Sequence, residues 1–195
     1  MTPRRVILAV TGASGMPYAA SLTRALSGRE DLELHLIVSE AARTVLAAET
    51  DLSVEDLCAG AAATYRESDI AAPPASGSWH NEGMIVCPCS MATLAAIAQG
   101  LGTNLIHRAA DVALKERRRL VLVARETPVS IVHLRNMLAA AEAWAVVMPA
   151  CPGFYHRPAG IGELADHLAG RVLDQFGIPH ALSRRWGEDQ ERRGP

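Results

Sequence analysis

The sequence predicts one α/β domain built on a doubly wound parallel sheet. Short apolar runs alternate with longer segments whose apolar residues recur at helical spacing, which is the order of repeated strand–helix units. The length of 195 residues suits a single domain with one sizeable core. Hydrophobic residues make up 49% of the chain and charged residues 21%, as is typical of globular proteins.

Five segments are predicted to be strands. Each is a short, nearly continuous apolar run, which is typical of a strand that is buried on both faces of a parallel sheet. In chain order the predicted strands are 4–10, 33–39, 83–88, 120–126 and 145–149.

Helices are predicted between the strands and after the last one. The first ends at Gly28, a residue type that favours the end of a helix. Pro128 is expected near the first turn of another helix, where its missing N–H does no harm. The predicted helices are 16–28, 40–50, 90–100, 105–118, 127–143 and 158–177, and a short one from Ser53 begins an otherwise irregular stretch that continues to Ser78.

Composition and charge exclude several classes of function. The net charge of −2 and the lack of a basic block argue against nucleic acid as the main partner. The apolar runs fall far short of the ~18 residues that a membrane span needs, and the first of them reads as a strand and not as a signal peptide. Four cysteines without a secretory signal indicate a reducing, cytoplasmic location. We expect the domain to cover residues 1–182, and a charged tail to follow over 183–195.

The turn TGASG, at residues 11–15, follows the first strand. Ligands of doubly wound sheets bind beyond the carboxyl ends of the strands, so this turn is a candidate binding site. Gly12 lets the backbone approach a ligand, Ser14 can donate a hydroxyl, and free N–H groups at the start of the next helix favour an anion. The alternative is a tight turn that the fold requires. The spacing fits neither a dinucleotide-binding nor a P-loop motif, so NAD and Mg-ATP are not indicated.

Two serines and two cysteines mark other strand ends. Ser39 and Ser90 are each either a helix cap or part of a shared hydroxyl-lined crevice. Cys87 and Cys89 are expected to point to the same face of their strand. Neither zinc spacing nor the two-residue spacer of a redox pair is present, so we interpret them as buried structural cysteines and expect no metal site.

A charged block lies between residues 105 and 127. Arg108, Asp111 and Lys115 share one helix face, and Asp111 is placed to hold both cations. The following strand delivers Arg125 and Glu126 to its carboxyl end, where this fold builds sites. The alternative is a solvated basic helix followed by an ion pair.

For three further residues the sequence permits either a role in the site or a place on the surface. Tyr155, on the last loop, and Arg171, on the last helix, suit a phosphate ligand if they meet at one crevice. Otherwise they are a rim aromatic and a surface arginine. Glu49 ends the second helix and is either exposed or directed into the crevice.

A family resemblance rests on four segments: TGASG, PCSMATLAAIAQG, NLIHRAADVALKERRRLVLVARETP and FYHRP. Together they resemble the UbiX family of flavin prenyltransferases, from about residue 6 to residue 178. The resemblance implies a flavodoxin-like, three-layer fold and a homo-oligomer, usually a dodecamer built from trimers. It implies transfer of a dimethylallyl group from dimethylallyl monophosphate to N5 and C6 of reduced FMN. The product, prenylated FMN, would serve a UbiD-type decarboxylase.

The resemblance also implies site residues. FMN contacts are expected at Gly12, Ala13, Ser14, Ser39, Ser90, Met91, Ala92, Thr93 and Arg125. Prenyl phosphate contacts are expected at Lys115, Tyr155 and Arg171, with Arg108 and Glu126 close by. Catalytic roles are expected for Glu49, Lys115, Glu126 and Trp79, the last as an aromatic face beside the prenyl group. Family sites lie between subunits, so some of these residues are expected to serve a neighbouring copy.

The chain departs from the family pattern in places. Ala92 stands where many members have lysine, Trp79 where phenylalanine or tyrosine is usual, and Trp144 where glycine is common. Two other functions share the fold and FMN: a decarboxylase of cysteine peptides, and a non-enzymatic FMN carrier. The RAADV–LKERR–RETP block argues against the first, and the cations beside the flavin site argue against the second.

Overall fold

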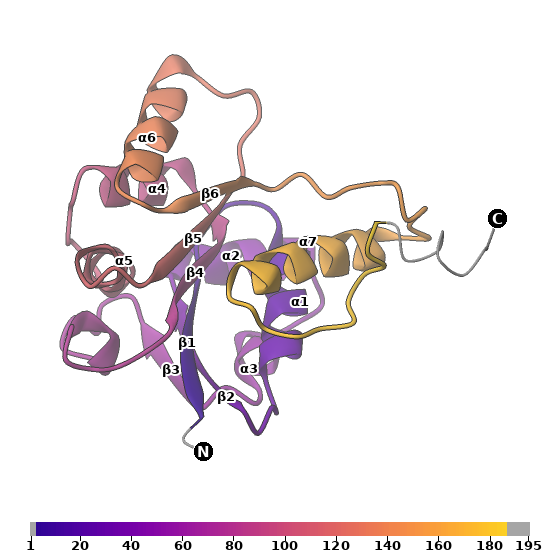
Figure 1. The fold of residues 1–195 in the computed structure, drawn as a ribbon, viewed down its shortest axis with the longest axis horizontal. Coiled ribbons are helices and arrows are strands. Elements are labelled where there is room, and N and C mark those ends of the chain that lie inside the picture. Colours follow the sequence, from indigo (N-terminus) through magenta and orange to yellow (C-terminus); the bar gives the residue numbers. More distant parts are fainter. Residues whose placement is uncertain (1–2, 187–195) are drawn as a thin grey trace.

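The protein folds around a six-stranded, fully parallel sheet, seen in a computed structural model that describes residues 3–186 (Figure 1). The strand order is β3-β2-β1-β4-β5-β6, so the direction of winding reverses between β1 and β4. The predicted doubly wound sheet is therefore confirmed, and the reversal is where such folds bind ligands. The strands are β1 (Arg4–Val10), β2 (Leu32–Val38), β3 (Ala63–Arg66), β4 (Gly83–Cys89), β5 (Arg119–Ala124) and β6 (Val146–Pro149).

Helices cover both faces of the sheet and make three layers (Figure 1). One face of β1, with Val6 and Leu8, packs against α1, α2, α3 and α7, and the other face, with Ile7, packs against α4, α5 and α6. Burial on both faces explains why β1 is a continuous apolar run. The helices are α1 (Met16–Leu26), α2 (Glu40–Glu49), α3 (Val54–Cys58), α4 (Met91–Ala98), α5 (Leu105–Lys115), α6 (Ile131–Glu142) and α7 (Ile161–Gln175), and η1 (Pro73–Ala75) is a 3₁₀ turn.

The strand β3 corrects the expectation of an irregular segment after α3. It has four residues, pairs only with β2, and alternates half-buried with exposed side chains. An edge strand that is short and partly polar lacks the continuous apolar run that identifies the other strands. Tyr65 anchors it, because its hydroxyl lies 3.0 Å from Nδ1 of His35 on β2.

The helix α6 begins later than predicted. Pro128 lies before it, after a cis peptide bond with Thr127, and the helix starts at Ile131. Ser130 is the N-cap: its hydroxyl accepts the N–H of His133, whose ring in turn accepts the N–H of Ser130. This reciprocal capping fixes the start of the helix at Ser130 and not at the proline.

The two cysteines of β4 do not share a face. Cys87 packs in the core on the α1 and α7 side, whereas Cys89 packs in the core on the α4 and α5 side. The register with β5 shifts between Val86 and Cys89, which breaks the regular alternation that the prediction assumed. Both side chains are fully buried, so their interpretation as structural residues is confirmed.

The chain after α7 folds back along that helix. Leu182 packs against the core, Arg185 forms an ion pair with Asp174 (2.9 Å), and Trp186 meets Tyr155 edge to face. The rest of the predicted tail, residues 187–195, lies outside the described residues. The domain boundary at residue 182 therefore stays a prediction. None of the helices in the described part of the chain is long and apolar enough to cross a membrane.

Candidate functional site

The carboxyl ends of β1 and β4 are joined through Thr11. Its hydroxyl donates to the carbonyl of Pro88 (2.7 Å) and accepts the backbone N–H of Ser90 (2.9 Å). The backbone N–H of Ser39 donates to Val10 (3.1 Å), which brings the end of β2 to the same place. The structure thus brings three predicted elements, the TGASG turn, Ser39 and Ser90, to one edge of the sheet, which is the crevice that the sequence predicted for this fold.

Both predicted serines cap helices at this edge. The Ser39 hydroxyl accepts the N–H of Ala42 (3.1 Å), and the Ser90 hydroxyl accepts that of Thr93 (3.2 Å). Ser90 also donates to the Thr93 hydroxyl (3.1 Å), which leaves the Thr93 proton available. At Ser90 the two interpretations are compatible, because the start of α4 favours an anion. At the start of α2, the carboxylate of Glu67 already accepts the N–H of Glu40 (2.8 Å).

The start of α1 is not an open anion site. The carboxylate of Glu49 accepts the N–H groups of Gly15 (2.8 Å) and Met16 (2.9 Å). Burial alone would raise the pKa of Glu49, but hydrogen bonds from Ser14, Gly15 and Met16 and the charge of Arg125 hold that pKa below its usual value. The anion predicted at this helix start is therefore a carboxylate of the chain itself. Glu49 is exposed, and its carboxylate points to the TGASG turn, so the structure does not separate the two alternatives that the sequence left open.

Arg125 supplies the positive charge of the crevice. It directly follows β5, its backbone N–H donates to Cys89 (3.1 Å), and its side chain is half-buried. Its charge acts on Glu49 and on the phenol of Tyr18. The pKa of Tyr18 is raised overall, first by burial and then by the Cys87 and Cys151 thiols. The charge of Arg125 offsets part of this rise.

Tyr18 is a crevice residue that the sequence reasoning missed. Its ring lies against the Gly15 turn, at a distance that a side chain on Gly15 would violate. The signal for Tyr18 was its place two residues into α1, directly after the TGASG turn.

The TGASG turn is packed closely against α2. A side chain on Gly12 would overlap the Cβ of Ala41, so only glycine fits there. Ala13 and Met91 are buried, whereas Ala92 is exposed on the first turn of α4. Glu126, also exposed, follows Arg125, and its carboxylate accepts the N–H of Thr127 (3.0 Å).

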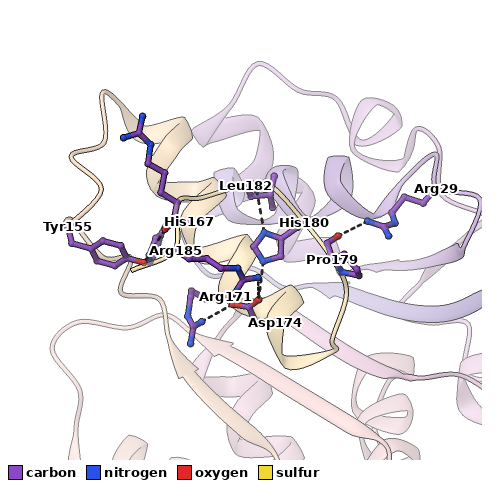
Figure 2. Close-up of polar contacts among 10 residues, drawn as sticks. Arg29, Tyr155, His167, Arg171, Asp174, Pro179, His180, Leu182 and Arg185 are labelled. Carbon is purple, nitrogen blue, oxygen red and sulfur yellow. Dashed lines mark hydrogen bonds and ion pairs between the residues drawn. The ribbon is translucent and has the colours of Figure 1, made fainter. Parts of the chain in front are cut away.

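Tyr155 and Arg171 form a second group, on the loop after β6 and on α7 (Figure 2). Figure 1 shows this loop leading away from the sheet before α7 returns over it. Tyr155 contacts His167, with 3.2 Å between the phenol oxygen and Nε2. Arg171 forms an ion pair with Asp174 (2.7 Å), which also binds His180 and Arg185.

Trp79, Arg108 and Lys115 form a third group, on α5 and the segment before β4. Trp79 packs edge to face on His35 (4.7 Å), and the Arg5 guanidinium covers its ring at 5.4 Å. Because Arg5 belongs to the first residues of β1, Trp79 lies towards the amino ends of the strands and does not join Arg125 within one protomer.

The cations of α5 are paired differently from the prediction. Arg108 binds Asp111 (2.6 Å) and the carbonyl of Ala75 (3.2 Å). Lys115 instead binds its neighbour Glu116 (2.7 Å), so Asp111 does not hold both cations. Lys115 ends α5 just before β5, whereas Arg125 follows the far end of that strand.

The donor set of the crevice suits flavin mononucleotide. Hydroxyls, the start of α4 and one arginine match a phosphate and the polar edge of a flavin. Gly12 and Gly15 keep the first turn narrow enough for its backbone to line the crevice. Within residues 3–186, no three His, Cys, Asp or Glu side chains are grouped to hold a metal ion.

Comparisons with known proteins identify the class of protein to which this chain belongs. The sequence matches the family described as Flavoprotein over residues 1–167. A curated relative, Flavin prenyltransferase UbiX of Deinococcus radiodurans, is 50% identical over 188 residues, which are 96% of each chain. The chain belongs to this flavoprotein family, among the UbiX-type flavin prenyltransferases.

Two solved structures share the fold closely. A dodecameric FMN-dependent UbiX-like decarboxylase from Escherichia coli O157:H7 superimposes with a TM-score of 0.91 at 44% identity, covering 93% of this chain and 98% of that one. AnUbiX (PadA1), in complex with FMN and dimethylallyl pyrophosphate, gives a TM-score of 0.88 at 46% identity, covering 95% and 98%. The flavodoxin-like fold is thereby confirmed.

Proposed function

We propose that this chain is a flavin prenyltransferase that joins a dimethylallyl group, taken from dimethylallyl monophosphate, to N5 and C6 of reduced FMN. The observation that carries the proposal is the 50% identity with Flavin prenyltransferase UbiX over 96% of the chain. The geometry supports it, because the crevice at β1 and β4 offers the hydroxyls, the helix start and the cation that FMN needs.

FMN would lie along the carboxyl ends of β1, β2, β4 and β5. Arg125 would hold a negatively charged or electron-rich group, and the start of α4 would donate hydrogen bonds. Nine residues would line this binding site: Gly12, Ala13, Ser14, Ser39, Ser90, Met91, Ala92, Thr93 and Arg125.

The prenyl donor breaks at its allylic C–O bond. Negative charge then remains on the departing phosphate, and positive charge develops on the prenyl carbon. Arg171, Lys115 and Arg108 would stabilise the phosphate as cations, and Tyr155 would donate its hydroxyl. Bound reduced FMN would supply the nucleophilic N5 and C6 atoms. N5 would take the prenyl carbon and lose its proton; the prenyl double bond would then take up a proton, and C6 would close the ring and lose its own proton.

The two glutamates suit different tasks. Glu49 is held as an anion by several hydrogen bonds, so it is a weak base that fixes the first turn. Glu126 is exposed and accepts one hydrogen bond, from the N–H of Thr127. We therefore assign proton transfer to Glu126 or to the released phosphate.

A complete site needs more than one copy. Arg125, Tyr155 and Lys115 lie in three separate groups within a protomer, so we propose that neighbouring copies supply the missing groups. Four residues of α6 expose apolar side chains that suit such contacts: Ile131, Val132, Leu134 and Leu138. We infer a homo-oligomer, and a dodecamer by analogy with the UbiX-like decarboxylase from E. coli O157:H7.

The test is an anaerobic reaction of the purified protein with reduced FMN and dimethylallyl monophosphate, followed by mass spectrometry of the flavin. We expect a mass increase that corresponds to one added dimethylallyl group. Bound FMN without an adduct would contradict the proposal. Release of CO₂ from a cysteine peptide, or a stable one-electron flavin, would point to the two other functions.

Variants separate chemistry from binding. Lys115→Ala and Glu126→Ala should bind FMN normally yet form the adduct slowly. An equal loss of FMN affinity would instead make these residues structural. The product would pass to a UbiD-type decarboxylase, and we place the reaction in the cytoplasm.

A further inference from the structure

His167 on α7 lies beneath the loop that carries Tyr155. The residue is buried, with 5% of its surface exposed. Its Nδ1 lies 3.2 Å from the backbone nitrogen of Gly153. Its Nε2 lies 3.2 Å from the hydroxyl of Tyr155 (Figure 2). One buried imidazole thus contacts the loop at two points.

These contacts determine which ring nitrogen carries the proton. A backbone N–H can only donate, so Nδ1 must accept the hydrogen bond from Gly153. In the neutral ring the proton is then on Nε2, which donates to the oxygen of Tyr155. The phenol keeps its own proton for another acceptor. In this structure that proton is directed to the carbonyl of Arg184 at 3.5 Å, a long contact that a phosphate oxygen would replace.

The surroundings of His167 keep it neutral. His156 stacks on it at 4.8 Å, Tyr155 meets it edge to face at 5.4 Å, and Arg171 follows one turn later on α7. The neighbouring carboxylate, Asp166, is bound by side chains of α1. Burial, followed by the charges of His156 and Arg171, lowers the pKa of His167.

We propose that His167 is a positioning residue for prenyl transfer: it orients the hydroxyl of Tyr155 so that its proton is offered to the phosphate of the prenyl donor. The inference rests on the proposed function, because it takes that phosphate as the acceptor. It adds a residue that contacts neither substrate. Protonation of His167 would place a second donor against the N–H of Gly153, so the arrangement would fail in acid.

Two substitutions separate the two contacts. His167→Asn keeps an acceptor near the position of Nδ1 for Gly153 but is too short to reach Tyr155. His167→Gln places an amide donor near the position of Nε2 and removes the titrating ring. Net hydrogen-bond energies of about 0.5–1.5 kcal/mol correspond to roughly 2- to 12-fold, so H167N should raise the KM for dimethylallyl monophosphate by about that factor. H167Q should stay within about twofold of the wild type, and the Kd for FMN should be unchanged in both.

Tyr155→Phe completes a double-mutant cycle. In that background H167N should change KM no further, because the contact it removes is already lost. Because the pKa of His167 is lowered from its ordinary value of about 6.5, the ratio of wild-type to H167Q affinity for the prenyl donor should be constant from pH 8 to about 6.5 and fall only below that. Titration of the phosphate itself cancels in this ratio. A KM within twofold of wild type for H167N, effects of H167N and Y155F that multiply, or a ratio that already falls above about pH 6.5 would each overturn the inference.

Binding of inorganic phosphate keeps this test independent of catalysis. Calorimetry should show weaker phosphate binding for H167N than for H167Q or the wild type. If the wild type forms no prenylated flavin but this order of affinities holds, the proposed function fails while the positioning role stands. If prenyl transfer occurs and phosphate binds equally to all three proteins, the positioning role fails alone.

Discussion

The hydroxyl of Thr11 accepts the backbone N–H of Ser90 at 2.9 Å, which ties the turn after β1 to the start of α4. The same hydroxyl donates to the carbonyl of Pro88 at 2.7 Å, and the side chain is 2% exposed. One buried oxygen therefore satisfies two backbone groups where the winding of the sheet reverses. This contact holds the turn after β1 against the end of β4 and the start of α4.

Thr11→Val should lower both stability and FMN affinity. The substitution keeps the side-chain shape but leaves the N–H of Ser90 without its partner, at a cost of about 1–3 kcal/mol. The carbonyl of Pro88 keeps only the backbone N–H of Thr11, at 3.3 Å. Urea unfolding and flavin fluorescence titration measure the two effects. Thr11→Ser keeps the hydroxyl and is the matched control. Equal stability of T11V and T11S would contradict the role of the hydroxyl.

Glu49→Gln should reduce stability in a pH-dependent way. The pKa of Glu49 is lower in the folded than in the unfolded chain, so its ionised form stabilises the fold at pH values above its ordinary pKa of about 4.3. This contribution is lost as the pH falls through the lowered pKa. The difference in unfolding free energy between wild type and E49Q should therefore be constant from pH 7 to about 5.5 and shrink below about pH 4. A difference that does not change with pH would mean that Glu49 does not bind the start of α1 as an anion.

Arg125→Ala should weaken FMN binding. A charge-assisted hydrogen bond contributes about 1.5–3 kcal/mol, so the Kd should rise roughly 10- to 100-fold. Fluorescence quenching of free FMN gives the Kd directly. Arg125→Lys retains the charge without the planar fork of the guanidinium, so its Kd for FMN should lie between those of the wild type and of R125A. An unchanged Kd for R125A would place FMN away from β5.

The four cysteines should differ in reactivity towards a thiol reagent. Burial raises the pKa of Cys87 and of Cys89, which keeps both as inaccessible thiols, whereas Cys151 is exposed and Cys58 is half-buried. We expect one fast reaction in the native protein, a slower second one, and two more only in denaturant. Cys151→Ser should remove the fast phase alone. Fast labelling of Cys87 or Cys89 in the native protein would contradict their burial.

Leu138→Asp should disrupt the assembly and leave the protomer folded. Leu138 is 60% exposed on α6, whose single buried residue is Ala140, so a charge there costs the isolated protomer little. Light scattering should report a smaller species, and circular dichroism should be unchanged. Leu138→Ala keeps an apolar surface and should assemble. An intact oligomer in L138D would exclude this face from the contacts between copies.

The sequence predicted the sheet well where burial leaves a clear pattern. β1, β2, β4 and β5 are nearly continuous apolar runs because helices cover both of their faces. β3 was missed because it lies at an edge and is only half-buried. The opposite facing of Cys87 and Cys89 was missed because the alternation rule assumes a regular ladder, whereas the register shifts within β4.

The sequence predicted which residues lie at the site, but not which of them contact one another. Residues directly after strands, such as Ser39, Ser90 and Arg125, could be placed at one edge because parallel strands end together. The bond between Glu49 and Gly15 joins residues 34 positions apart and depends on how α2 packs, which no local pattern encodes. The sequence showed no indication of the role of His167 either, because the pattern of residues in a helix does not show whether a tyrosine from a distant loop contacts its histidine.

The separation of Lys115 from Arg125 has a genetic consequence. The six residues of β5 lie between these two side chains and span about 20 Å. If each site takes its lysine from one copy and its arginine from another, an allele that lacks only Lys115 and an allele that lacks only Arg125 damage different halves of each site. A cell that expresses both alleles would assemble some sites with neither defect. Two inactive genes would then restore part of the activity when present together.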